Sequence, residues 1–198
     1  MGRSLTLKTN RTSQFNWVIA FAALNGMLSE FLLAHLMALT WGSIYKQYAL
    51  TMGLFVLSMG FGAWKFRSSQ AALRSLIKIL MASIFFIVLA FAFTWAHSQH
   101  LFSENILLAQ LILILVLGFL SGAELPLLEQ IQKQLQPISS VSQVLIWDYL
   151  GMAMGSLLFG FYMLQAWGVL GTLIFICCLH IVMIGWLLLG QLPKGESL

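Results

Sequence analysis

Charged residues are scarce in this chain of 198 residues, where Asp, Glu, Lys and Arg make up 8% of the sequence and hydrophobic residues 60%. In a soluble domain about a quarter of the residues are charged. The chain therefore has too little polar surface to cover a globule in water, and the composition predicts an integral membrane protein in contact with a lipid bilayer. Its ten basic residues and net charge of +4 form no dense basic patch, so nucleic acid is not expected as a partner.

The sequence also lacks the residue sets that carry most enzyme chemistry. The two cysteines, Cys177 and Cys178, are adjacent, so on a helix their side chains point about 100° apart and make a poor disulfide pair. Without a histidine or an acid at ligand spacing they predict no metal site. No activated serine and no phosphate-binding loop is recognisable, so the sequence predicts no catalytic residues, no metal, no cofactor and no enzyme activity.

Six segments are long and apolar enough to cross a bilayer, which needs about 20 mostly apolar residues. They predict an all-α integral membrane protein, a bundle of about six transmembrane helices in one domain, with a tight turn near 165–168. The expected spans are about 16–41, 48–64, 76–96, 106–128, 144–165 and 168–190.

Lys and Arg are unevenly distributed between the ends of these spans. Lys46 follows the first span, whereas the other basic residues precede that span or follow the second, fourth or sixth. Cytoplasmic loops carry an excess of Lys and Arg in membrane proteins. Both termini are therefore predicted to face the cytoplasm.

Three acidic residues, Glu30, Glu124 and Asp148, fall inside the predicted spans. A charged residue near the centre of a membrane helix costs roughly 2.5–3.5 kcal/mol for insertion, so these side chains are expected to face the bundle interior or a wet cavity. Glu124 lies just before the fourth span ends and Asp148 just after the fifth begins, which predicts similar depths. Pro126 cannot donate to the Gly122 carbonyl, so a bend and a free acceptor are expected there.

Two interpretations of these acids stay open at this point. Each acid could be protonated and hydrogen-bonded to a neighbouring helix, with a purely structural role. Three acids in one small protein, two of them at matched depth, favour instead a site for a cation or a proton. Asn25, Ser29 and His35 surround Glu30 on the first span and are candidates to complete that site.

Glycines stand four residues apart on two of the helices that carry these acids. Gly118 and Gly122 form one such pair, and Gly151 and Gly155 form another. Rows of this kind allow two helix backbones to approach closely in lipid. They are therefore predicted to pack helices rather than to bind a ligand.

Four stretches follow one another along nearly the whole chain in an order that fits a known family. They are NGMLSE in the first span, LFVLSMGFG in the second, GFLSGAELPLL in the fourth and VLIWDYLGMAMGSLLFGFYMLQAWGVLG across the last two. Together they resemble the membrane domain of bacterial spermidine synthase-like proteins. The resemblance rests on Glu30, Glu124, Pro126, Asp148, Tyr149 and the glycines, and it adds Tyr149 to the candidate site.

The resemblance implies a multi-pass protein of the bacterial inner membrane with a transporter-like membrane domain. Members of this family usually continue into a soluble aminopropyltransferase domain of the S-adenosylmethionine type. The 198 residues contain no α/β stretch and no glycine-rich loop after a strand, so the catalytic residues of that domain have no counterpart in them. Gly160 and Gln165 stand where the family pattern has prolines.

The leading hypothesis is a non-catalytic membrane protein that binds or translocates a small cationic or amphipathic molecule. That molecule is polyamine-like if the resemblance is informative, with Glu30, Glu124 and Asp148 as its counter-charges. The alternative is an accessory or anchoring subunit of a larger membrane complex, with the acids paired to a partner and the small-residue rows as docking faces. A homodimer and a complex with a partner membrane subunit are both compatible with the sequence.

Overall fold

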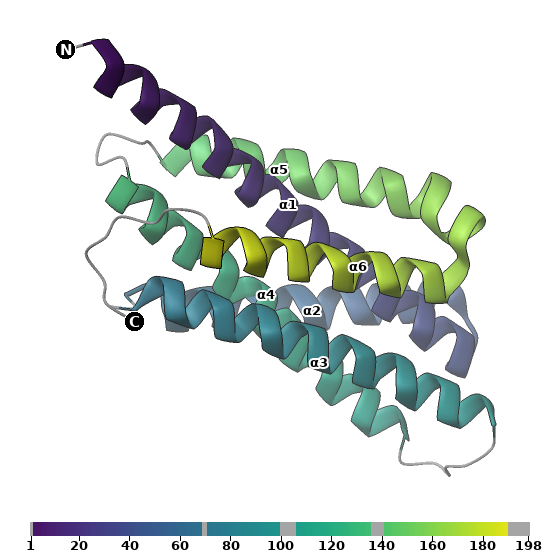
Figure 1. The fold of residues 1–198 in the computed structure, drawn as a ribbon. Helices are drawn as coiled ribbons and strands as arrows, with labels where there is room; N and C mark the ends of the chain where they lie inside the picture. The colour runs from purple at the N-terminus through teal and green to yellow at the C-terminus, as the bar shows by residue number, and fades with distance from the viewer. Residues whose placement is uncertain (1, 69–70, 100–105, 136–140, 190–198) are drawn as a thin grey trace.

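The computed structural model describes residues 2–68, 71–99, 106–135 and 141–189, with side chains in the first helix from Phe15 onward. This described part is helical and contains no strand. A π-helical segment, η1, separates the last two α-helices. The elements are α1 (Gly2–Trp41), α2 (Ile44–Phe66), α3 (Ala72–Ser98), α4 (Ile106–Leu135), α5 (Val141–Leu158), η1 (Phe159–Met163) and α6 (Leu164–Leu189) (Figure 1).

Five segments of the described chain are long and apolar enough to cross a membrane. The last of them, Val141–Leu189, contains α5, η1 and α6, and its backbone leaves helical geometry at Gly168, where φ is 64° and ψ is −169°. The chain reverses at this end of α5, so that α5 and α6 run in opposite directions (Figure 1). The helical fold is thus confirmed, and the backbone break falls in the turn expected near 165–168. Six separate crossings stay a prediction.

The helices are longer than the apolar runs from which they were predicted. α2 begins at Ile44 rather than near 48, and α4 continues to Leu135 rather than ending near 128. The Nε2 atom of Gln130, in the added part of α4, donates to the carbonyls of Phe66 at 2.9 Å and Arg67 at 3.0 Å. The extension of α4 therefore supplies donors to carbonyls that the end of α2 would leave unpaired.

α1 is the central helix of the bundle. In its most apolar window 72% of the residues are buried, against 22% for α2. It contacts all five other α-helices, and its most extensive contact is with α5, whereas α2 packs most extensively on α4. α1 therefore connects two closely packed helix pairs, α1 with α5 and α2 with α4.

Glycines form the closest of these helix contacts. A Cβ atom added to Gly122 on α4 would overlap the backbone of Met59 on α2, and Gly118 faces the same helix one turn earlier. Gly151 and Gly155 on α5 face the backbone of α1 in the same way. Because these glycines meet backbone atoms, which cannot rotate aside, larger residues would push the helices apart.

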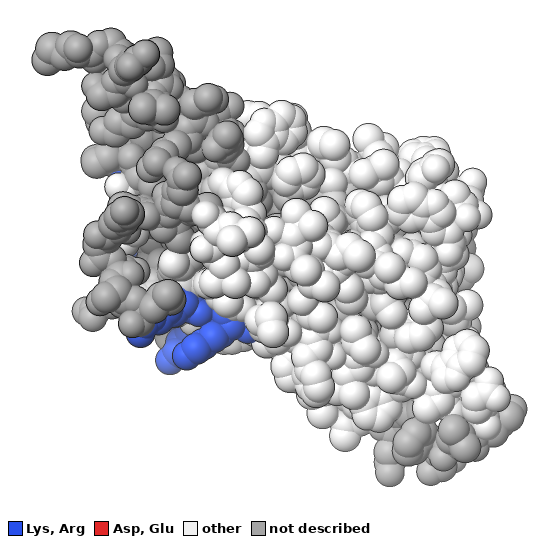
Figure 2. Space-filling model, viewed as in Figure 1, with Lys and Arg blue, Asp and Glu red and all other residues white. Residues whose placement is uncertain are grey.

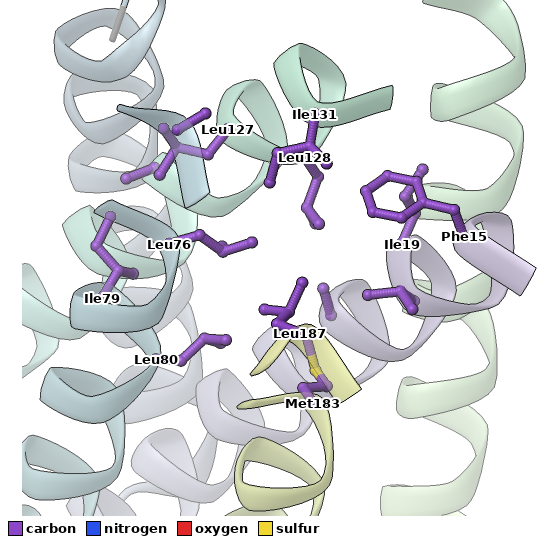
Figure 3. Close-up of a cluster of buried hydrophobic side chains, with 14 of the residues drawn as sticks. Phe15, Ile19, Leu76, Ile79, Leu80, Leu127, Leu128, Ile131, Met183 and Leu187 are labelled. Atoms are coloured by element: carbon purple, nitrogen blue, oxygen red, sulfur yellow. The ribbon is translucent and has the colours of Figure 1, made fainter. Parts of the chain in front are cut away.

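Apolar side chains from five helices meet in a cluster that includes the Phe15–Ala22 stretch of α1. Phe15 of α1, Leu76 of α3, Leu128 of α4 and Leu187 of α6 belong to this cluster of buried residues (Figure 3). Leu128 stands one helical turn beyond Glu124 on α4. The cluster therefore fixes the depth at which the Glu124 carboxyl is held.

Basic side chains gather at one end of the molecule. The first residue of α1 and the last residue of α6 lie at this end, together with the start of α3 (Figure 1). Lys and Arg are visible near the start of α3, and no Asp or Glu is visible on the described part of this face (Figure 2). The acids of the spans are thus absent from this part of the surface.

Gly168→Ala is expected to destabilise the protein by about 1–3 kcal/mol, because a positive φ with ψ near 180° is a conformation essentially restricted to glycine. Thermal unfolding of the purified protein in detergent measures the loss. Gly160→Ala is the matched control, since Gly160 lies in the adjacent π-helical segment without a positive φ and with open space around its Cβ position. Equal losses in the two variants would show that the backbone angle at Gly168 is not what matters.

Candidate functional site

A cavity of about 280 Å³ lies among α1, α2, α4 and α5, and Glu30, Glu124 and Asp148 all line it. We call it the acid cavity. Glu30 comes from α1, Glu124 from α4 and Asp148 from α5. The fold thus brings together at one place three carboxyl groups that are far apart in the sequence.

The local helix geometry explains why these side chains face the acid cavity. Residues four apart lie on the same side of a helix, so Glu30 continues the row of Gly26, and Glu124 continues the row of Leu128. All four of these residues line the cavity. Glu30 and Glu124 are each 6% exposed, whereas Asp148 is half-buried. The two glutamates therefore form the deep part of the site and Asp148 the more accessible part.

Within the described residues, the acid cavity offers its three carboxyl groups no basic partner. None of the described side chains that line it is basic. Lys133 pairs with Glu129 outside the cavity, and the three acids of the cavity make no hydrogen bond with the described residues. Glu124 and Asp148 repel each other when both are ionised. A bound cation would relieve this repulsion and offset the cost of keeping carboxylates in apolar surroundings.

The rest of the acid cavity is mostly apolar. Met27 of α1, Met59 of α2 and Met152 of α5 each contribute a thioether side chain, and Ser121 of α4 adds one hydroxyl. Methionine has several rotatable bonds and a polarisable sulfur, so it adapts to ligands of irregular shape. Across the described ranges, no group of three His, Cys, Asp or Glu side chains is placed to hold a metal ion.

The residues predicted to support the acids lie elsewhere in the fold. Asn25, Ser29 and His35 do not line the acid cavity, although all three are on α1. Tyr149 is 63% exposed and does not line it either, because residue 149 follows Asp148 by about 100° around α5. Pro126 lies inside α4, which continues as a helix through it.

Asn25 forms a separate polar contact between α1 and α6. Its Nδ2 atom donates to Nδ1 of His180 at 2.6 Å, and both residues are almost completely buried. The Ser29 hydroxyl donates to the backbone carbonyl of Asn25 at 2.8 Å. The polar stripe on α1 therefore holds α6 in place, while Glu30 faces the other way into the acid cavity.

Most other lining residues of the acid cavity were not predicted from the sequence, among them Gly26 and Ser121. The Ser121 Oγ atom lies 2.7 Å from where a Cβ of Gly26 would stand, so a larger residue at position 26 would require the Ser121 hydroxyl to rotate aside. The spacing of Gly26 four residues before Glu30 was visible in the sequence and could have identified it. Nothing in the sequence placed Ser121 opposite α1.

Comparison with curated proteins identifies three relatives of the chain. Polyamine aminopropyltransferase 2 of Aquifex aeolicus is 29% identical over 154 residues, which cover 76% of this chain and 31% of the relative. The polyamine aminopropyltransferase of Leptospira interrogans is 29% identical over 150 residues, covering 74% of this chain and 30% of the relative. That of Oceanobacillus iheyensis is 28% identical over 171 residues, covering 79% and 31%. No protein-family model and no solved structure matches the chain significantly.

These matches confirm the resemblance to spermidine synthase-like proteins. The similarity extends over about three quarters of this chain, but the matched part is only about 30% of the length of the relatives. The chain is therefore similar to a limited part of enzymes that are named for aminopropyl transfer.

Proposed function

We propose that this protein is a non-catalytic, multi-pass membrane protein that binds a small organic cation in the acid cavity and passes it through the bundle. The observation that carries the proposal is the meeting of Glu30, Glu124 and Asp148 around one cavity that none of its described lining residues neutralises. Ionisable residues inside membrane helices generally face a bundle interior and mark ligand or ion pathways.

The similarity to polyamine aminopropyltransferases supports a cationic amine as the ligand class. Polyamines carry several ammonium groups, and the relatives are named for chemistry on polyamines. Because the similarity covers only about 30% of those proteins, their activity does not transfer to this chain. The proposal takes from the relatives' names only the class of ligand, an amine, and the carboxyl groups of the cavity supply its chemical basis.

The proposal includes a membrane orientation. α5 and η1 would form one membrane crossing before Gly168, and α6 would form another after it. The bundle would then cross the membrane six times, with both chain ends on the same side. Lys65, Arg67, Lys78 and Lys133 would lie on that side, and Lys46 on the other. The excess of basic residues assigns the side with the ends to the cytoplasm of a bacterial inner membrane.

The test is equilibrium binding of two amines, spermidine and phenylbutylamine, to the protein in lipid nanodiscs by titration calorimetry. Wild type should bind at least one of them. Glu124→Gln and Asp148→Asn should each weaken that binding by about tenfold or more, since a lost interaction of 1.4 kcal/mol is a factor of ten.

Glu129→Gln is the matched control for this experiment. Glu129 is on the same helix as Glu124 but pairs with Lys133 at 2.5 Å and does not line the acid cavity. Its replacement should leave amine binding unchanged. If wild type binds neither amine, or if the Glu124 and Asp148 variants bind as wild type does, the proposed function is wrong.

A second candidate function, an accessory subunit of a membrane complex, is favoured by the outward face of α2. Gly53 and Gly60 are exposed on this face with open space around their Cβ positions. Leu57, Phe61 and Trp64 join Gly60 around a surface hollow of about 400 Å³. Glycines on a lipid-facing helix allow a further helix to approach closely, from a second copy or from another protein. A protein with this function alone would bind neither amine in the calorimetric experiment.

A further inference from the structure

The acid cavity has an opening on the outer surface of the bundle, at α2. Val56 and Gly60 line the cavity, and Val56 is 53% exposed while Gly60 is also exposed. On the other side of the cavity, Met152 of α5 is half-buried. α2 and α5 make no extensive contact with each other, because α2 packs mainly on α4 and α5 packs mainly on α1. The cavity therefore runs from a mouth beside α2 inward to the buried carboxyls of Glu30 and Glu124.

The mouth lies near the middle of its helix. Val56 stands about 15–18 Å from either end of α2 at 1.5 Å per residue. The hydrocarbon layer of a bilayer is about 30 Å thick, so the centre of a spanning helix lies about 15 Å from both membrane surfaces. When α2 spans the membrane, the mouth of the acid cavity faces lipid hydrocarbon rather than water.

The wall of the cavity changes in character from the mouth inward. At the α2 side the wall is apolar, with Val56 and Met59, whereas Glu30 and Glu124 place their carboxyl groups in the deeply buried part. On the α5 side, Asp148 is half-buried and stands one helical turn before Met152. Such a gradient matches a molecule with an apolar body and one cationic head. The head would reach the carboxylates, and the body would lie against the methionines, which adapt their shape.

We propose that the ligand of the acid cavity is a bilayer-soluble amphipathic amine that enters sideways from the membrane through the opening at Val56 and Gly60. This inference rests on the proposed function and specifies its substrate class and its route of entry. A free polyamine suits this route poorly, because several unpaired charges make its transfer into hydrocarbon very unfavourable. An amine with a large apolar body concentrates in the bilayer, where the mouth lies.

Three probes separate the contributions of charge and apolar body. Phenylbutylamine has both, phenylbutanol has the same body without the charge, and spermidine has charge without a compact apolar body. Titration calorimetry in nanodiscs, with empty nanodiscs subtracted, should give phenylbutylamine an affinity about tenfold or more above that of either other probe.

The route of entry is tested at the mouth with Gly60→Leu. Open space surrounds the Cβ position of Gly60, so a leucine there fits without displacing the backbone while filling the opening. It should slow the association of phenylbutylamine by about tenfold in stopped-flow measurements, because the ligand must then wait for the side chain to move. Gly53→Leu is the matched control: its position on α2 is equally exposed and open but does not line the cavity.

The outcomes separate this inference from the proposed function. If phenylbutylamine binds more tightly than spermidine and phenylbutanol, and Gly60→Leu but not Gly53→Leu slows its association, the result supports lateral entry of an amphipathic amine. If spermidine binds more tightly than phenylbutylamine, and Glu124→Gln weakens spermidine binding, the inference is overturned while the proposed function stands. Association unchanged in a stably folded Gly60→Leu protein overturns the route. Binding of neither amine overturns both proposals.

Discussion

Glu124→Leu is expected to make the protein more stable and, at the same time, unable to bind an amine. The gain in the free energy of unfolding should be about 1–3 kcal/mol, the usual cost of a buried polar group that has no hydrogen-bond partner. In a protein of this size each kilocalorie per mole raises the Tm by about 2–4 °C. Thermal unfolding and calorimetric amine binding, measured on the same preparation, check both parts of the expectation.

The expectation follows from the surroundings of Glu124. The side chain is 6% exposed, makes no hydrogen bond within the described part of the chain and shares its cavity with the acid Asp148. Its neighbours in the acid cavity include Leu125 and Leu128, so a leucine at position 124 would meet apolar partners. A residue kept at a cost to stability is typical of a functional site.

Asn25→Leu is the matched control, because Asn25 is as deeply buried but has a partner. Its Nδ2 atom lies 2.6 Å from Nδ1 of His180, and a leucine would remove this buried polar contact between α1 and α6. A hydrogen bond contributes about 0.5–1.5 kcal/mol to stability, so this variant should be less stable than wild type by about that amount. A Glu124→Leu protein that is destabilised to the same extent would show that Glu124 has a structural role.

Some features of the site could be predicted because they depend on position along one helix. The sequence placed Glu124 near the end of one span and Asp148 near the start of the next, which predicted that they lie close together, although α4 continues to Leu135. Both side chains do line one cavity. The break at Gly168 was likewise visible as a short turn between two apolar runs.

Other features depend on which helices become neighbours, and the sequence does not contain that information in a local form. Asn25 and Glu30 are close in the sequence, yet they are about 140° apart around α1, so one faces α6 and the other faces the acid cavity. Tyr149 was included through the family resemblance and is exposed. The opening at Val56 exists because α2 and α5 pack on different helices, a fact of tertiary structure alone.

Gly122→Val is expected to be the most destabilising single substitution among those considered for the helix contacts. Even a Cβ at this position would overlap the carbonyl group of Met59, and its Cα would lie 2.5 Å away. Overpacking costs typically 1–3 kcal/mol, and here the upper end of about 3 kcal/mol or more is expected because backbone atoms cannot rotate aside. The corresponding drop in Tm is about 6–12 °C, measured by thermal unfolding in detergent.

Gly53→Val on the outward face of α2 separates this steric effect from the general cost of valine in a helix. No atom lies within 4 Å of the Cβ position of Gly53, so the substitution introduces the same side chain without a clash. Its stability should change by less than about 1 kcal/mol, because valine is a slightly better helix former than glycine. A Gly122→Val protein as stable as Gly53→Val would mean that α2 and α4 can separate at little cost. The acid cavity, whose walls include both helices, would then lack a fixed shape, and its selectivity for one class of amine would have to come from the carboxylates alone.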